Sequence, residues 1–289
     1  MEGGGVTWAA NFWDVIHDLY WSPQRLGLNR VQAIKNQDDS AFVKVPRRYL
    51  LGGEIRYRSK KWNETKLALL RDEKALNCFF DVMFSICPDY LIDRWLCKPL
   101  GIEDVSEFRS FSLLHLSERF GWGDDNVTQH DGFFISPNSI VCVEIKLKAQ
   151  TDINQIIKYA AIVKLEETAT GIRDNIGLLY VVPKKRINTI KNKVSIESLS
   201  WPVLGEQPGV KLNPKIKTII ESDPSHFDSV LKRLRINIIS WSDLYDQVTA
   251  EHQQLDPRNS SEQTLYRLLD GFLEQLRAHQ DTGIELPAP

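Results

Sequence analysis

The sequence lacks several features that would place it in a special class of protein. It has no apolar run near the roughly 18–20 residues that a transmembrane helix needs, no low-complexity tract and no internal repeat. Its first residues, MEGGGVTWAANFWDVIHDLY, contain Glu2 and Asp14 and no basic cluster, so they do not resemble a secretory signal peptide. We therefore expect a cytoplasmic protein that does not bind a membrane.

Cysteine is scarce and is not arranged for metal binding. No two of the four cysteines form a CxxC pair, and all stand in apolar stretches, which argues against a structural zinc or iron–sulfur site. The sequence predicts four buried free thiols. These are Cys78, Cys87, Cys97 and Cys142.

An excess of positive charge is also missing, since the formal net charge is -2. This excludes a globally basic nucleic-acid binder but not a local phosphate-binding patch. Basic residues are concentrated in two stretches, 184–193 and 232–235, whereas the segment from Asp243 onward is mostly acidic. That acidic segment is either a contact surface for a partner or simply solvated.

The apolar pattern predicts a large core built from both helices and strands. Helices are expected within 5–35 and over 71–86, the latter followed by a short helix that ends near Gly101. The stretch 41–61 resembles a β-hairpin with a turn at Gly52-Gly53. Its basic side chains could face phosphates or only solvent.

The middle of the chain predicts a mixed sheet. Strands are expected over 130–135, 140–148, 176–182 and 236–241, with a helix from Asp152 to about Glu167, a less regular region over 183–213, then a further helix and two acidic C-terminal helices. We predict an α/β fold whose mixed central sheet is flanked by helices. The expected parts are an N-terminal helical and β extension (1–62), a core (63–183) and a C-terminal α/β and helical region packed on the core (184–289).

The hairpin formed by the first two of these strands places charged residues together. Folding it over the loop at 136–139 sets Ile135 opposite Ile140 and Asp131 opposite Glu144. Strand alternation puts Glu144 and Lys146 on one face, together with Cys142 and Lys148. Two facing carboxylates repel each other unless a cation lies between them, which suggests a divalent metal site with Lys146 beside it.

The alternative is a solvated strand face on which Asp131 and Glu144 pair with Lys146 and Lys148. Against it, the helix and apolar strand that follow indicate that 140–148 is a central strand. A charge on a central strand is costly unless it serves a function.

The pattern Asp131…Glu144-Ile145-Lys146 resembles the PD-(D/E)XK nuclease superfamily, with His130 where many members have proline. The helix that follows carries Gln155-Ile-Ile-Lys-Tyr159, which is similar to the QxxxY motif of RecB-like members. The resemblance covers roughly 71–182 and implies a restriction-endonuclease-like core. Two simpler interpretations stay open: Gln155 could complete a capping box with Asp152, and Tyr159 could only pack.

The resemblance implies a set of roles for these residues. Asp131, Glu144 and the carbonyl of Ile145 would bind Mg²⁺ or Mn²⁺, and Lys146 would orient the attacking water. Gln155 and Tyr159 would position the nucleic-acid backbone or the lysine. Family members usually carry one more acid on the preceding helix, to hold a metal-bound water. We expect Glu73 here, with Glu64 and Glu118 as alternatives.

These roles predict a metal-dependent nuclease acting on DNA rather than RNA, in a microbial antiviral defence, restriction or repair setting. Nucleic-acid contacts are expected from Lys148, Lys184, Lys185 and Arg186. A protein partner or a second copy of the chain could control the activity. The rival interpretation is a catalytically inactive member of the same fold that binds nucleic acid or assembles with proteins. Removing Lys146 should abolish turnover and leave binding largely intact.

Overall fold

The computed structural model describes residues 7, 8, 12, 73–104, 107–111, 116, 118–122, 130–148, 152–194, 199–207 and 209–284. The chain divides into two compact units, Met1–Ala75 and Leu76–Pro289. The predicted hairpin at 41–61 and the boundary at 62 lie outside the described residues, as does most of the helix predicted within 5–35. None of the described helices is long and apolar enough to cross a membrane.

A five-stranded mixed sheet forms the centre of the second unit, in the order β1-β2-β3-β4-β5. β1 pairs with β2 and β2 with β3 in antiparallel fashion, whereas β3, β4 and β5 run parallel. The predicted mixed α/β fold is therefore confirmed. The strands are β1 (Arg109–Ser110), β2 (Gly132–Ile135), β3 (Ser139–Ile145), β4 (Asn175–Val182) and β5 (Leu234–Ser240).

The hairpin between β2 and β3 has the predicted register. Ile135 pairs with Ile140 and Gly132 with Val143. The Ser136 amide closes the turn by donating to the Ser139 carbonyl at 2.9 Å. β3 is the third of the five strands and is buried along its whole length, so the prediction of a central strand is also confirmed.

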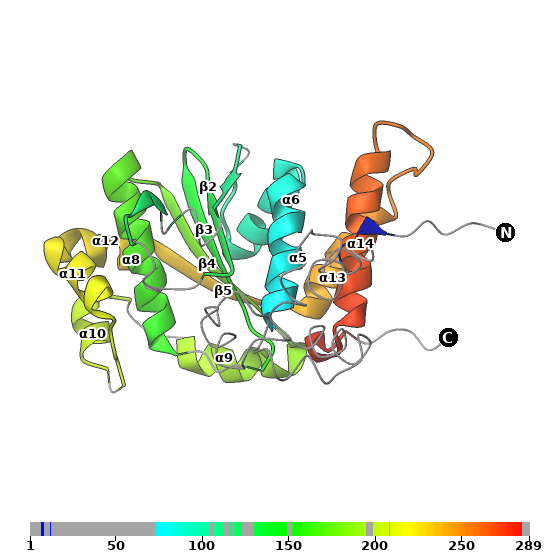
Figure 1. The fold of residues 1–289 in the computed structure, drawn as a ribbon. Coiled ribbons are helices and arrows are strands. Elements are labelled where there is room, and N and C mark those ends of the chain that lie inside the picture. The colour runs from blue at the N-terminus through cyan, green and yellow to red at the C-terminus, as the bar shows by residue number, and fades with distance from the viewer. Residues whose placement is uncertain are drawn as a thin grey trace, which may run out of the picture. The chain divides into compact units, whose positions relative to one another are not determined.

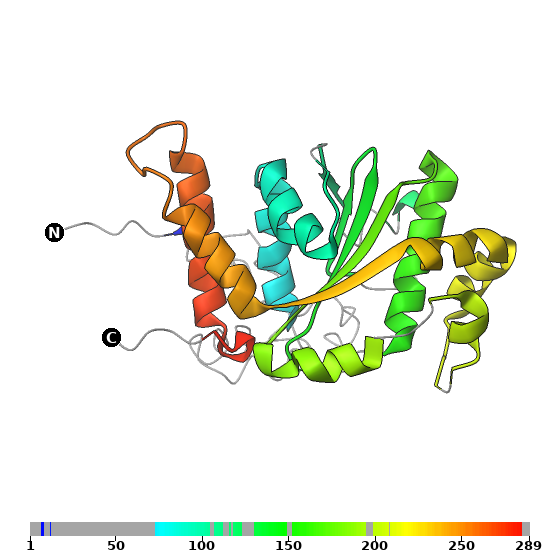
Figure 2. The same ribbon diagram turned by 180° about the vertical axis from the view of Figure 1, so that it is seen from behind.

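Helices cover both faces of the sheet (Figure 1). α8 (Ile153–Thr170) packs on one face, where Cys142, Tyr159 and Tyr180 share a core with residues of the helices that follow β4. Those helices are α9 (Ile187–Val194), α10 (Trp201–Gly205), α11 (Pro214–Ser222) and α12 (Pro224–Arg233), and α9 follows a 3-10 turn, η6 (Lys184–Arg186). Both views show α9 lying across the end of the sheet where β4 finishes (Figures 1 and 2).

The other face is covered by α5 (Glu73–Ile86) and α6 (Asp89–Ile92), which continues as η4 (Asp93–Cys97) and η5 (Lys98–Leu100). The predicted helix over 71–86 is confirmed, because Phe80, Met83 and Phe84 are buried at helical spacing. The Phe84 ring makes edge contacts with Phe134 and Phe272. α14 (Gln263–Ala278) thus packs on α5, and α13 (Trp241–His252) and η7 (Gln280–Thr282) adjoin it.

Two sequence predictions are wrong. Where the structure describes the region 183–213, it is more regular than predicted, since it contains η6, α9 and α10. The sequence of α9 gives only a weak helical pattern, because its buried residues Ile190 and Val194 stand among polar residues. Cys78 is exposed, because it lies on the outward side of α5. The other three cysteines are buried free thiols, as expected, and burial raises the pKa of Cys87 to about 12.

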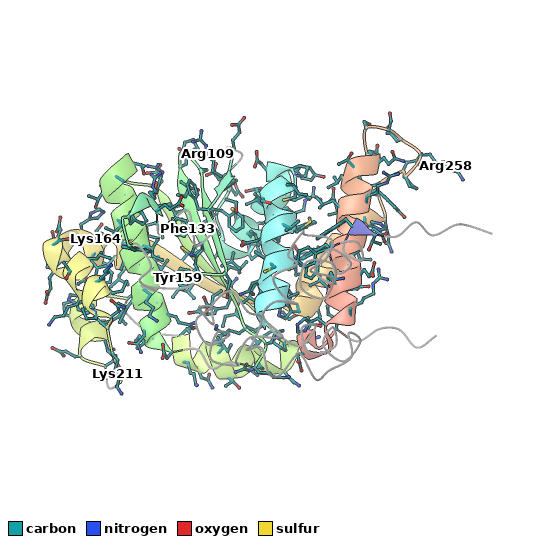
Figure 3. All side chains as sticks on the ribbon, viewed as in Figure 1. Arg109, Phe133, Tyr159, Lys164, Lys211 and Arg258 are labelled. Carbon is teal, nitrogen blue, oxygen red and sulfur yellow. The ribbon has the colours of Figure 1, made fainter. Side chains whose placement is uncertain are left out.

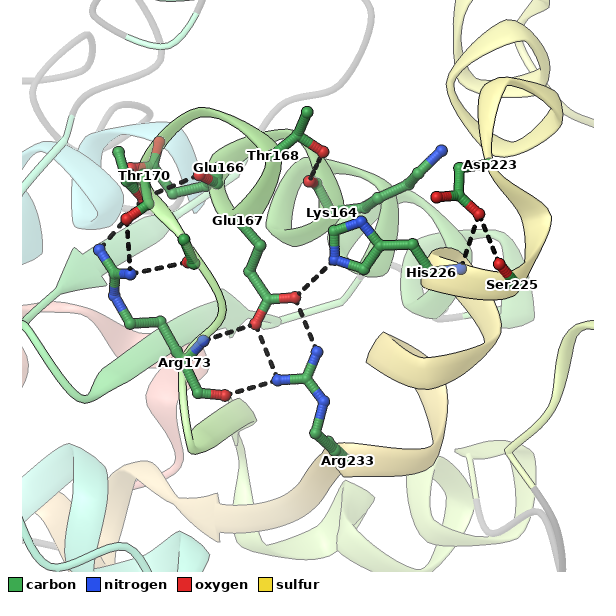
Figure 4. Close-up of polar contacts among 11 residues, drawn as sticks. Lys164, Glu166, Glu167, Thr168, Thr170, Arg173, Asp223, Ser225, His226 and Arg233 are labelled. Atoms are coloured by element: carbon green, nitrogen blue, oxygen red, sulfur yellow. Dashed lines mark hydrogen bonds and ion pairs between the residues drawn. The ribbon is translucent and has the colours of Figure 1, made fainter.

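The C-terminal end of α8 is fixed by a buried carboxylate (Figure 4). Both oxygens of Glu167 accept hydrogen bonds from Arg233, at 2.8 and 2.7 Å, and His226 lies 2.9 Å from one of them. Burial alone would raise the pKa of Glu167, but these donors and the Arg173 amide lower it. A buried carboxylate is tolerated when it is paired and hydrogen-bonded in this way. The cluster joins α8 to α12 and the start of β5.

Close packing at Gly177 generates a stability prediction. A Cβ atom there would collide with Leu100 and lie 3.1 Å from Ile102 Cδ1. Gly177→Ala should therefore lower the free energy of unfolding by about 1–3 kcal/mol through overpacking. In a Leu100→Ala background the same Gly177→Ala change should cost less, because the clashing side chain is gone, and chemical denaturation of the single and double variants can measure this non-additivity. A Gly177→Ala variant as stable as wild type would contradict this account.

Candidate active site

The candidate site lies at the carboxyl end of β3. Glu144 and Ile145 are the last residues of that strand, and Lys146 follows directly. β4 runs parallel to β3 and ends at the same edge, the edge at which open α/β sheets bind their ligands. Glu144 is 2% exposed and Lys146 is 7% exposed, so the interpretation as a solvated strand face is wrong.

Three side chains meet on the Glu144 carboxylate. The Lys146 ammonium lies 2.6 Å from Oε1, and the Gln155 side-chain amide donates to the same oxygen. The Tyr159 hydroxyl lies 2.5 Å from Oε2 and 2.9 Å from the Val143 carbonyl. Gln155 and Tyr159 are one helical turn apart on α8, which is why both reach β3. Figure 3 labels Tyr159 on the side of α8 that faces the sheet.

The capping interpretation of Gln155 is not what the structure shows. Asp152 does take the N-cap position of α8, but its side chain makes no capping hydrogen bond. The Gln155 side chain points to Glu144 instead. The four-residue spacing of Gln155 and Tyr159 thus gathers two donors on one acid.

Asp131 lies directly before β2 and bridges the two helical layers. One of its oxygens accepts a hydrogen bond from the Asn77 amide on α5, and the other accepts from the Ile145 backbone N–H at 2.7 Å. Its own backbone N–H is 3.4 Å from the Tyr159 hydroxyl on α8. The β2–β3 ladder, continued by one residue, sets Asp131 opposite Glu144 as predicted.

Sequence reasoning missed two residues of this site, Asn77 and Tyr180. Asn77 follows Glu73 by one helical turn, so the helix spacing alone could have suggested it. Tyr180 pairs with Glu144 across the parallel β3–β4 ladder and is fully buried. No sequence signal fixes that pairing, because it depends on how the α8 crossover aligns the two strands.

Burial sets the protonation of the groups around the two acids. Burial and the nearby charge of Glu144 and Asp131 raise the pKa of Tyr159, so its hydroxyl remains a donor at neutral pH. Burial also lowers the pKa of His130, whose Nε2 donates to the Phe111 carbonyl at 2.8 Å. The imidazole that stands before Asp131 is therefore neutral and serves to anchor the chain.

The oxygens of the site suit a hard divalent cation. Mg²⁺ is commonly bound by one or two carboxylates and several waters, a set that Asp131, Glu144 and the Ile145 carbonyl could supply. No group of three or more His, Cys, Asp or Glu side chains suited to a metal occurs in the part of the chain that the structure describes. Protein donors already contact all four carboxylate oxygens, although each carboxylate offers about four lone pairs. An ion would therefore share Glu144 with Lys146 and Gln155.

The three candidates for the helix acid fall in different places. Glu73 begins α5, one turn before Asn77, and its side chain is not among those described. Glu64 lies outside the described residues. Glu118 is exposed, and its neighbour Arg119 binds Glu166 at 2.8 Å, near the opposite end of α8 from Gln155. The structure does not bring Glu118 to the site.

The expected nucleic-acid contacts all lie close to where β3 and β4 end. Lys184 and Lys185 are exposed on η6. Arg186 donates to the Leu147 carbonyl at 3.0 Å. The Lys148 ammonium is 2.6 Å from the Asp281 carboxylate of η7. Lys148 and Arg186 are therefore engaged within the protein, whereas Lys184 and Lys185 face solvent.

No protein-family model, no curated protein sequence and no solved structure matches this chain.

Proposed function

We propose that this protein is a metal-dependent nuclease that hydrolyses phosphodiester bonds of nucleic acid, with DNA favoured over RNA. One observation carries the proposal: a buried glutamate at the carboxyl end of a central strand collects Lys146, Gln155 and Tyr159 around it. Burying such a charged cluster is costly. Clusters of this kind occur preferentially at functional sites.

In this proposal, different groups orient the two acids, Glu144 and Asp131. Gln155 and Tyr159 orient Glu144, while Asn77 and the Ile145 N–H orient Asp131. Asp131, Glu144 and the Ile145 carbonyl would hold Mg²⁺ or Mn²⁺. The ion, when bound, polarises the scissile phosphate and lowers the pKa of a bound water.

Lys146 supplies the nearby positive charge. Its ammonium is buried beside Glu144, so it keeps a fixed position, and an ammonium carries three N–H donors. In the proposed reaction it donates to the attacking water or to a phosphate oxygen as negative charge develops there. Such preorganised donors act mainly on the transition state.

A second candidate is a non-catalytic module of this fold that binds nucleic acid or assembles with proteins. The observation that favours it is the full set of protein donors on Asp131 and Glu144, which satisfies both acids without an ion. Metal binding separates the two candidates. A role in antiviral defence, restriction or repair, and a controlling partner, stay predictions from the resemblance.

The central prediction concerns cleavage. Wild-type protein should cut plasmid or single-stranded DNA with Mg²⁺ or Mn²⁺ and not in EDTA. Lys146→Gln should lower the rate by at least about 100-fold, the usual effect of losing a preorganised donor. Lys217→Gln is the matched control and should keep the activity, because that lysine is exposed on α11 and lies 3.7 Å from Glu221. Equal cutting by wild type and Lys146→Gln would refute the assigned role.

Metal binding gives a prediction that does not depend on turnover. Mg²⁺ or Mn²⁺ should raise the melting temperature of wild type, because an ion that binds the folded state alone stabilises it, by about 2.7 kcal/mol at 100 times Kd. The double variant Asp131→Asn, Glu144→Gln should lose this rise. A rise of the same size in both proteins, or none in wild type, would favour the non-catalytic module.

The Tyr159 hydroxyl can be tested against a matched hydrogen bond elsewhere. Tyr159→Phe keeps the ring and removes the donor to Glu144, so it should cost about 1–3 kcal/mol of stability and lower kcat. Tyr90→Phe removes a similar tyrosine–glutamate bond, 2.7 Å to Glu251, and should leave cleavage unchanged. A Tyr159→Phe protein with wild-type kcat would show that the hydroxyl has no part in catalysis.

A further inference from the structure

The chain that follows β4 is strongly basic. Residues 183–194, PKKRINTIKNKV, contain five lysines and arginines and no aspartate or glutamate. The structure folds them as η6 and α9. Ile190 and Val194 turn inward into the core on the α8 side of the sheet. The lysines are exposed, and we call the surface formed by Lys184, Lys185 and Lys191 the basic face.

Exposed lysines on α11 and α12 form ion pairs with acids on their own helices. Lys217 on α11 lies 3.7 Å from Glu221, and Lys232 on α12 lies 2.6 Å from Asp228, each one turn along its own helix. Such i, i+4 pairs are the usual fate of surface charge on a helix. Lys184, Lys185 and Lys191 have no acid three or four residues away on either side, so they cannot form such pairs.

The basic face begins at the candidate site. η6 starts two residues after β4 ends, at the sheet edge where β3 also finishes. The Arg186 guanidinium holds η6 to this edge through the Leu147 carbonyl, one residue beyond Lys146. α9 then runs across that end of the sheet (Figures 1 and 2). Positive side chains therefore extend outward from the buried Glu144–Lys146 pair.

We propose that the basic face binds the phosphate backbone of a nucleic acid and leads one strand to the site at Glu144 and Lys146. The proposal rests on the nuclease function and adds the path of its substrate. η6 and α9 together extend about 18 Å, which spans about five phosphates of one strand of duplex DNA. Lysines contact phosphates without reading bases, so the binding is independent of sequence.

The C-terminal turn η7 limits this surface at one point. The Asp281 carboxylate binds Lys148, the exposed lysine nearest in sequence to Lys146. A phosphate at this edge must compete with Asp281 for that ammonium. Asp281 therefore weakens binding near the site, and its removal gives Lys148 to the backbone.

Binding in EDTA tests the basic face without turnover. A fluorescent 30-mer, single- or double-stranded, is titrated with protein over a series of salt concentrations. The triple variant Lys184→Gln, Lys185→Gln, Lys191→Gln should bind at least 10-fold more weakly than wild type at low salt. Its slope of log K against log salt should fall by about 2–3, since each duplex phosphate contact contributes about 0.9. Unchanged melting temperatures verify folding, as all three lysines are exposed.

A second triple variant removes the same charge elsewhere. Lys217→Gln, Lys232→Gln, Arg258→Gln changes exposed residues on α11, α12 and the loop before α14, and it should bind as wild type does. Asp281→Asn should bind about threefold more tightly, the usual size of a surface ion-pair effect. Equal loss in both triple variants, no loss in either, or no binding by wild type at low salt would overturn the basic face.

The nuclease function fails separately from this inference. Lys146→Gln should still bind the 30-mer in EDTA through the basic face, because Lys146 is buried and acts mainly on the transition state. Binding that depends on the basic face, in a protein that never cuts, would support the surface and contradict the nuclease. Cutting that depends on Lys146, with binding unchanged in the basic triple variant, would support the nuclease and contradict the basic face.

Discussion

The buried carboxylate of Glu144 is the interaction on which the site depends. Removing a carboxylate from water costs several kcal/mol unless donors replace the lost hydration. Lys146 directly follows the strand that carries Glu144, whereas Gln155 and Tyr159 both come from the first turns of α8. A shift of α8 would remove both of these donors and leave Glu144 buried with Lys146 as the one partner of the three.

A buried acid at the other end of α8 shows that burial alone does not indicate function. Glu167 receives a full guanidinium from Arg233 and a histidine, and it lies where β4 and β5 begin. Its partners link α8 to α12 and to the start of β5. Glu144 lies instead where β3 ends, the edge at which parallel sheets bind ligands, and its lysine partner can also serve a bound anion. Place in the fold, rather than cost of burial, distinguishes the two.

The sequence was sufficient for whatever depends on local periodicity. The four-residue loop between Ile135 and Ile140 set the hairpin register, and the four-residue spacing of Gln155 and Tyr159 set their common direction. It was insufficient where packing between distant elements decides. Asn77 reaches Asp131 only because of how α5 lies on the sheet, and Tyr180 meets Glu144 only through the register of a crossover. The sequence did not predict α9, because its few buried residues are outnumbered by lysines and asparagines.

Charge balance at the sheet edge joins these observations. Asp131 and Glu144 carry two negative charges against the one of Lys146, so the site alone repels a phosphate. Two features could offset that repulsion: a divalent ion held by the acids, and the lysines that continue outward on η6 and α9. The lysines act at longer range and over more of a polyanion. They would bring the backbone to the edge, while the ion and Lys146 would act at one phosphate. A segment of lysines and no acids over 183–194, beside a site with two acids, is the arrangement that this separation of binding from catalysis requires.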